Sequence, residues 1–227
     1  MAGSILNAIA FTPATSNTST TYTVPSTTAG SVICVVAGSN LTTTKTVKSV
    51  GGSSSNTWVK QFTDTSSNDI WTCLNAGAGL TSIIYSTNVT AYPWIMYFEI
   101  AGANTTGNVF AVTSNSGSSA AFSSVQLTPG TSSVALGFAF ETNDATSTGT
   151  PGTGWSAITG TGFSSGAAAN PTNGDTWYAE IRNVPAGTFS ANGTWSISQA
   201  GWAAYAIAFD QAAVTTTNQL RVILGMC

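Results

Sequence analysis

The sequence predicts an all-β protein, an antiparallel β-sandwich built from two sequence-related halves. Short apolar or alternating runs recur along the chain, separated by clusters of Gly, Ser, Thr, Asn and Pro. Many short strands with regular turn signals are typical of a sandwich or a barrel. No segment keeps an amphipathic 3.6-residue period over three turns, so we expect minimal helix. The third observation is that landmarks of residues 11–101 return in the same order over residues 110–209.

The internal repeat rests on four pairs of landmarks. These pairs are Ser31–Val36 with Ser133–Phe138, Asn56–Trp58 with Thr153–Trp155, Asp69–Trp71 with Asp175–Trp177, and Trp94–Tyr97 with Trp202–Tyr205. A repeat of roughly 100 residues is far longer than a solenoid unit and indicates two halves of one β architecture or two small β domains. We expect a single sandwich over residues 1–210, because no Pro-rich or charged linker separates the halves near residues 102–108. Residues 211–227 then form a C-terminal arm.

The expected strands follow from these runs. In the first half they are Ile5–Phe11, Thr20–Val24, Ser31–Gly38, Thr57–Thr63, Ile70–Leu74, Thr81–Thr87 and Trp94–Ala101. In the second half they are Val109–Thr113, Ser123–Leu127, Ser133–Phe140, Trp155–Thr159, Thr176–Arg182, Gly193–Ser198 and Trp202–Phe209. The runs at 31–38 and 133–140 are almost continuously apolar, as in central strands covered on both faces. The polar stretches 40–56, 141–154 and 160–174 are expected to be loops.

Alternation within one strand predicts which face is buried. In residues 175–181, Trp177, Ala179 and Ile181 share one face, which should be the core. Tyr178 and Glu180 lie on the opposite face.

Composition excludes several classes of function. Only 6% of the 227 residues are charged, with a net charge of −3, against about 25% in an average soluble domain. Five basic residues cannot form a stripe that follows phosphates, so no nucleic-acid partner is expected. No apolar run approaches the ~18 residues needed to cross a membrane, and the first residues lack the pattern of a signal peptide. A surface with so little charge gives poor protection against self-association, which favours a protein that works assembled or outside the cell.

The sequence offers few groups for catalysis. It contains no His, which removes Ser-His-Asp and Cys-His nucleophilic sites and ordinary zinc sites. No phosphate loop, dinucleotide fingerprint or EF-hand pattern is present. We therefore expect no enzymatic activity, no cofactor and no metal. Cys34 and Cys73 lie in apolar runs and are expected to be buried free thiols, whereas Cys227 is the thiol best placed to pair with another chain.

Some of the carboxylate residues could serve either a functional or a structural role. Glu99 and Glu180 lie on expected strands and could in principle form the carboxylate pair of a glycoside hydrolase. They occupy non-equivalent positions of the repeat, and we interpret them as polar groups on solvent-facing or edge strands. Asp69 and Asp175 are equivalent in the repeat, and a role at the start of a strand is favoured over a calcium site formed with Asp64 and Asp144.

The seven tryptophans suggest a carbohydrate-binding alternative, because sugars stack on exposed aromatic faces. Trp71, Trp94, Trp177 and Trp202 recur at equivalent, alternating positions and are expected in the core. Trp58 and Trp155 follow Gly-rich loops and are the best candidates for a surface that stacks on a glycan.

Each half of the internal repeat resembles a family of β-sandwich proteins found in phage virions or encoded by bacterial surface or prophage genes. The resemblance is carried by Ala29–Val36, Asn56–Trp58, Ile70–Thr72 and Met96–Ile100, and the second half repeats them in weaker form. The resemblance implies a concanavalin-like jelly roll and a non-enzymatic structural role on a phage particle. A capsid decoration or cement subunit is the favoured role, and a tail or fibre component comes next.

The family pattern does not account for the tail. A Thr-rich spacer, Val214–Thr217, leads to the strand-like run Gln219–Leu224. We expect Leu220, Val222, Ile223, Leu224 and Cys227 to form an assembly arm that adds a strand to a neighbouring subunit, with docking onto its own sheet as the alternative. The expected partners are other virion subunits and further copies of this chain. The expected location is the virion, assembled in the host cytoplasm, with an extracellular carbohydrate-binding or adhesin module as the alternative.

Overall fold

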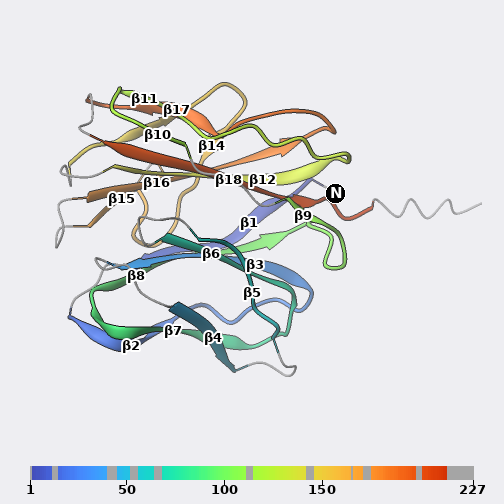
Figure 1. Cartoon of the computed structure of the whole chain (residues 1–227). Helices are drawn as coiled ribbons and strands as arrows, with labels where there is room; N and C mark the ends of the chain where they lie inside the picture. Colours follow the sequence, from blue (N-terminus) through green and yellow to red (C-terminus); the bar gives the residue numbers. More distant parts are fainter. Residues whose placement is uncertain are drawn as a thin grey trace, which may run out of the picture.

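The computed structural model describes residues 2–11, 15–39, 45–51, 56–63, 68–110, 115–141, 146–164, 166–170, 175–197 and 201–213. These residues form strands, turns and loops, and none of them is helical. The strands assemble into four sheets stacked as layers, two inner and two outer (Figure 1). The sequence-based prediction of an all-β antiparallel sandwich is confirmed. Within the described part of the chain, no helix is long and apolar enough to cross a membrane.

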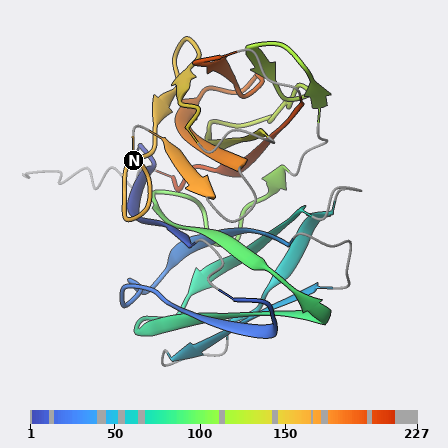
Figure 2. The same cartoon turned by 90° about the vertical axis from the view of Figure 1, so that its left-hand side faces the viewer.

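Residues up to Ala101, which are blue to green in Figure 2, supply two of the four sheets. The first inner sheet has the order β1-β8-β3-β6-β5, and the first outer sheet has the order β2-β7-β4. Their strands are β1 (Ser4–Phe11), β2 (Asn17–Thr23), β3 (Ser31–Ser39), β4 (Lys45–Gly51), β5 (Val59–Thr63), β6 (Asn68–Ala76), β7 (Leu80–Ala91) and β8 (Pro93–Ala101). All the pairings in these two sheets are antiparallel.

The rest of the chain supplies the other two sheets. The second inner sheet has the order β10-β18-β12-β16-β14, with β15 also on β16 and β9 on β18, and the second outer sheet has the order β11-β17-β13. Their strands are β9 (Val109–Phe110), β10 (Asn115–Gly117), β11 (Ala121–Ser123), β12 (Ser133–Glu141), β13 (Gly149–Pro151), β14 (Ser156–Ala157), β15 (Ala167–Asn170), β16 (Asp175–Val184), β17 (Asn192–Trp195) and β18 (Trp202–Asp210). The central three strands repeat the arrangement of the first inner sheet, with β12 between β16 and β18 as β3 is between β6 and β8.

Three hydrophobic clusters fill the spaces between the four layers. The largest lies between the two inner sheets, where Val32, Cys34 and Val36 of β3 face Leu136 and Phe138 of β12. The second cluster lies between the first inner and first outer sheets, and the third between the second inner and second outer sheets. Both inner sheets are therefore covered on both faces, which explains why β3 and β12 are apolar along nearly their whole length.

Aromatic rings fill the centre of the largest cluster. The Trp94 and Trp177 rings stack with their centroids 4.3 Å apart, and Phe140 packs 5.3 Å from the Trp94 ring. Gly38 lies opposite Trp94 in the ladder, and a Cβ on Gly38 would lie 2.2 Å from the Trp94 ring. A glycine near the end of β3 is therefore required by the bulk of the neighbouring indole.

Every expected strand overlaps an observed one, but four observed strands were missed. β4 and β13 lie within stretches predicted as loops, as does β15, and β10 has no counterpart in the prediction. All four are short or polar strands at the margins of their sheets. A strand that is only three or four residues long, or is mostly polar, leaves little alternation of apolar and polar residues in the sequence.

Two tryptophans at equivalent positions of the sequence repeat lie on opposite faces of their inner sheets, because the strand register differs between the halves. Trp71 and Trp177 are both buried, as predicted, but Trp71 faces the first outer sheet whereas Trp177 faces the other inner sheet. Trp71 pairs with Val35, the fifth residue of β3, whereas Trp177 pairs with Phe140, the eighth residue of β12. An odd shift in register moves a side chain to the opposite face of its sheet.

Candidate functional site

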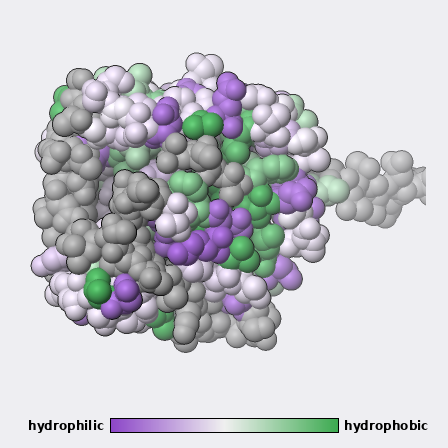
Figure 3. Space-filling model, viewed as in Figure 1, coloured by the Kyte–Doolittle hydropathy of each residue, from purple (hydrophilic) through white to green (hydrophobic). Residues whose placement is uncertain are grey.

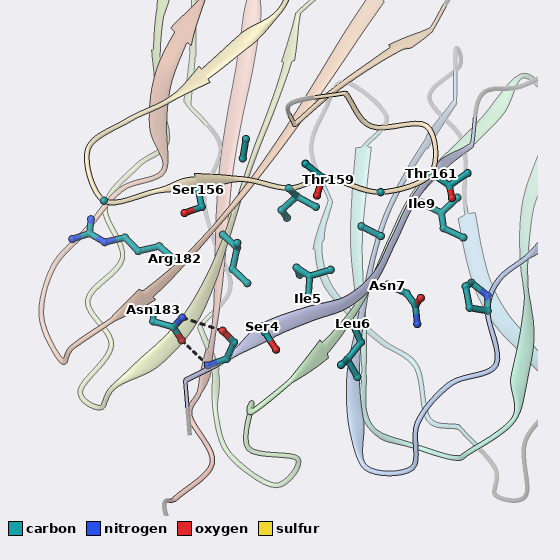
Figure 4. Close-up of a pocket in the computed structure, with 18 residues that line it drawn as sticks. Ser4, Ile5, Leu6, Asn7, Ile9, Ser156, Thr159, Thr161, Arg182 and Asn183 are labelled. Atoms are coloured by element: carbon teal, nitrogen blue, oxygen red, sulfur yellow. Dashed lines mark hydrogen bonds between the residues drawn. The ribbon is translucent and has the colours of Figure 1, made fainter.

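A groove of about 640 Å³ lies between the edges of the two inner sheets. One wall is β1, at the edge of the first inner sheet. The other wall is β14 with its flanking residues, at the edge of the second inner sheet. Figure 4 shows Arg182 and Ser156 at one end of this groove and Ile9 and Thr161 at the other.

The groove closes at one end through the side chain of Asn183, on β16. The Asn183 Oδ1 accepts a hydrogen bond of 2.7 Å from the Gly3 N–H, and its Nδ2 donates one of 3.0 Å to the Gly3 carbonyl (Figure 4). The amide thus pairs with Gly3 as a strand backbone would. Gly3 admits no side chain here, because a Cβ would lie 2.0 Å from Val134 of β12.

The other end of the groove closes where the loop after β14 pairs with β1. The Thr161 N–H donates to the Ala8 carbonyl at 3.0 Å, and the Ala10 N–H donates to the Thr161 carbonyl at 2.9 Å. This bridge is parallel. Gly162 has φ +81°, and its Cβ position is 2.5 Å from the Ala10 carbonyl oxygen, so only glycine fits.

Between these two closures the outer edge of β1 is open. From Ser4 to Asn7, no backbone group among the described residues pairs with this edge, and β1 has only β8 as a strand neighbour. Unpaired edge strands present a row of N–H and C=O groups that can accept another strand. Leu6, at the rim, is 43% exposed, and Ile5 and Ile181 pack against the largest hydrophobic cluster. The arrangement is suited to binding an extended peptide with apolar side chains.

Charge within the groove is sparse. Arg182 is its one charged residue, and no carboxylate of the described residues lies within 4 Å of its guanidinium. The same scarcity holds over the described chain, where the one ion pair joins Lys60 to the buried carboxylate of Asp69 at 3.1 Å. On the face seen in Figure 3, hydrophobic and hydrophilic residues are mixed at short range.

Glu99 and Glu180 are not on solvent-facing or edge strands, so that prediction was wrong. Both side chains are fully buried, and β8 and β16 each have neighbours on both sides. Glu99 shares a face with Tyr97, toward the first outer sheet, and Glu180 shares a face with Tyr178, toward the second outer sheet. The two carboxyl groups therefore point away from each other across two inner sheets spaced ≈ 10 Å apart, as packed sheets usually are. They cannot flank one glycosidic bond.

Each of these carboxyl groups has a local structural partner. Glu99 accepts hydrogen bonds from the Asn7 Nδ2 at 2.6 Å and the Thr28 N–H at 2.7 Å. Glu180 accepts one of 3.1 Å from the Asn192 N–H. Burial raises the pKa of Glu180 to about 8, although the Asn192 N–H lowers it. Glu180 therefore carries a proton at neutral pH.

The two tryptophans predicted to lie on the surface have different environments. Trp155 is only 6% exposed. Its Nε1 donates to the Ser190 carbonyl at 3.1 Å, and its ring packs 6.0 Å from that of Phe189, so the prediction of a surface ring was wrong. Trp58 is half-buried and packs against the second hydrophobic cluster.

The remaining predicted residues divide by whether the structure describes them. Cys34 and Cys73 are free and buried, as predicted. Asp69 and Asp175 lie at the starts of β6 and β16, and the described residues contain no cluster of three or more potential metal ligands. Asp64, Asp144 and the arm residues Leu220, Val222, Ile223, Leu224 and Cys227 lie outside the described residues.

Sequence reasoning did not find the groove. Its closures join Gly3 to Asn183 and Ala8 to Thr161, and residues so far apart in the chain leave no local pattern.

In comparisons with protein-family models, curated proteins and solved structures, nothing matches this chain.

Proposed function

We propose that this chain is a non-enzymatic structural protein on the outside of a phage particle. A capsid decoration or cement subunit is the favoured position, and a tail or fibre component comes next. The observation that carries the proposal is the open edge of β1 in the groove, because an unpaired strand edge on a rigid protein is a site for assembly.

The rest of the molecule is consistent with a structural role. Four sheets share three continuous hydrophobic clusters, which favours a stiff body rather than a hinged one. A surface with 6% charged residues favours contacts through shape and buried area over contacts through charge. The sequence resemblance to phage virion and bacterial surface proteins is the reason that we propose a phage particle as the site of assembly.

Fractionation of the source lysate tests this function. The lysate would be separated on a density gradient, and this chain would be quantified by mass spectrometry in each fraction. We expect a fixed ratio to a major capsid protein across the particle fractions. Recovery only as free protein at the top of the gradient would contradict the proposal.

A secreted carbohydrate-binding module is the second candidate, and Trp58 is the residue that favours it. Trp58 is partly exposed beside the exposed Val59, and aromatic rings on a surface can stack on sugars. Glycan-array binding that is lost in Trp58→Ala and kept in Val59→Ala would support this function. Equal signals from the two variants and the unmodified protein would remove Trp58 from consideration.

A further inference from the structure

The outer edge of β1 has a vacant hydrogen-bonding position at Ile5. Backbone groups of alternate residues point to the same edge of a strand, and those of Gly3 point outward, because Asn183 binds both its N–H and its carbonyl. Ile5 occupies the next alternate position, so its N–H and carbonyl point outward as well. Among the described residues, Asn183 binds the position before Ile5 and Thr161 the positions after it, and nothing binds Ile5 itself at this edge.

The edge around Ile5 is too short and too irregular for a long added strand. The register of β1 against β8 shifts between Ile5 and Asn7, which leaves Leu6 as the extra residue of a β-bulge. Beyond the bulge, Thr161 already binds the Ala8 carbonyl. An occupant can therefore pair with β1 through a single residue opposite Ile5, and about four of its residues fit between the two closures at the usual rise of a strand.

A cation lies at the Gly3 end of the groove. Arg182 precedes Asn183 on β16, and Figure 4 shows both side chains at this end. The guanidinium lies against the turn at Gly154, where an added Cβ would be 3.1 Å from the Arg182 Cζ. No carboxylate of the described residues lies within 4 Å of this guanidinium, so it is available to an anionic group of an occupant.

Apolar side chains line the groove beside the vacant position. Ile5 and Ile181 pack against the largest hydrophobic cluster, and Ile158 belongs to it. A residue paired with Ile5 in an antiparallel arrangement would point its side chain to the same face as Ile5. The groove therefore favours an apolar residue at that position of the occupant.

We propose that the groove binds the C-terminal end of a partner polypeptide, with the free carboxylate at Arg182 and an apolar residue next to last. The next-to-last residue exchanges two hydrogen bonds with Ile5, as in an antiparallel pair. The last residue then lies one step closer to Gly3, which brings its carboxylate to the Arg182 end.

The position of the cation selects this direction of the chain. A parallel chain end would direct its carboxylate toward Thr161, away from Arg182, the one charged residue that lines the groove. The inference rests on the proposed function, because it names the chemistry that the groove recognises in a neighbouring subunit.

Affinity selection from a defined peptide mixture tests the proposal on the purified full-length protein. The probe is an equimolar mixture of N-acetylated tetrapeptides. Their third residue is Ala, Ser, Val, Ile, Leu or Phe, and the other positions are Gly, Ser or Thr. Each peptide is present both with a free C-terminal carboxylate and as the C-terminal carboxamide, and the retained peptides are quantified by mass spectrometry.

We expect the acids to be retained roughly tenfold more than the matching carboxamides, because a carboxylate forms a charge-assisted pair with Arg182. Val, Ile and Leu should be enriched over Ser at the third position. Arg182→Gln should reduce retention of the acids to the level of the carboxamides. Lys48→Gln is the matched control, because it removes one positive charge from β4, on the first outer sheet, and it should retain the acids as the unmodified protein does.

A second variant, Ile5→Pro, tests the hydrogen bonds to β1. Proline removes the outward N–H, and an edge strand tolerates proline where that N–H faces away from the ladder. Retention of the acids should fall several-fold in Ile5→Pro and less in Ile5→Val, which keeps the N–H. Thermal unfolding of each variant establishes that it is folded before the selection.

Equal retention of acids and carboxamides would overturn the proposal. So would retention by Arg182→Gln equal to that by the unmodified protein, or the absence of any retained peptide. The lysate fractionation is an independent test. Peptide binding by a protein that never enters particles would remove the virion function and keep the peptide site, and particle incorporation without peptide binding would do the reverse.

Discussion

The buried carboxyl group of Glu180 predicts that this protein loses stability as the pH rises. Glu180 is 0% exposed and lies between β12 and the second outer sheet. Its carboxyl group has a pKa of about 8 in the folded protein, against 4.5 when exposed, and burial is the main cause. The folded state therefore binds a proton that the unfolded chain releases. The stabilising contribution is complete below pH 4.5 and is lost as the pH rises through about 8.

The size of this loss follows from the shift. The pKa difference, from 4.5 to about 8, at about 1.4 kcal/mol per unit corresponds to a total decrease of about 5 kcal/mol in the free energy of unfolding from well below pH 4.5 to well above pH 8, of which about 4 kcal/mol falls between these two values. Glu180→Gln keeps the shape and a neutral group that can still accept the hydrogen bond from the Asn192 N–H. We expect this variant to lose most of that dependence and to be several kcal/mol more stable than the unmodified protein at pH 8.

Urea unfolding at intervals from pH 5 to 8.5, followed by tryptophan fluorescence, measures these free energies. Gly38→Ala is the control, because its Cβ would lie 2.2 Å from the Trp94 ring in the largest hydrophobic cluster, on the other side of the second inner sheet from Glu180. This control should lower stability by a similar amount at every pH. If the Glu180→Gln curve ran parallel to that of the unmodified protein, the assignment of a protonated, buried Glu180 would be refuted.

Three further predictions concern the core, the groove and the thiols. Trp94→Ala should lower the free energy of unfolding by about 3–5 kcal/mol in urea titrations, because it leaves a cavity beside Trp177; a change below about 1 kcal/mol would contradict the central stack. Gly162→Ala should lower the free energy of unfolding by about 1–3 kcal/mol and speed amide hydrogen exchange in β1, since φ is +81° and the added Cβ would clash with the backbone of β1. Unchanged exchange would show that the loop after β14 does not hold the edge of β1. Cys34 and Cys73 should resist a thiol reagent at pH 8 until urea unfolds the protein, because burial raises the pKa of both thiols, and that of Cys73 to about 11. Rapid reaction of these two thiols in the native protein would contradict their burial.

Local pattern was sufficient for the strands that form the centre of each inner sheet. The apolar runs that became β3 and β12, and the alternating run that became β16, carry their own signal, because their side chains pack in the core along most of the strand. The same reasoning placed Trp94 and Trp177 in the core and Cys34 among apolar residues. None of these conclusions needs knowledge of distant neighbours.

Stacking of the sheets determines what local pattern leaves open. Alternation shows that Glu180 and Trp177 lie on opposite faces of β16, but it does not show whether the polar face meets solvent or another sheet. Here the second outer sheet covers it, so Glu180 is buried and protonated. Trp155 is likewise buried by Phe189, a contact between residues 34 positions apart.

The groove depends even more strongly on distant contacts. Gly3 and Asn183 are 180 residues apart in the chain, and they meet because the two inner sheets pack face to face with their edges aligned on one side. Amino-acid sequence defines each strand through the alternation of its side chains, whereas the open edge of β1 exists because long-range packing leaves that edge without a neighbour from Ser4 to Asn7 among the described residues.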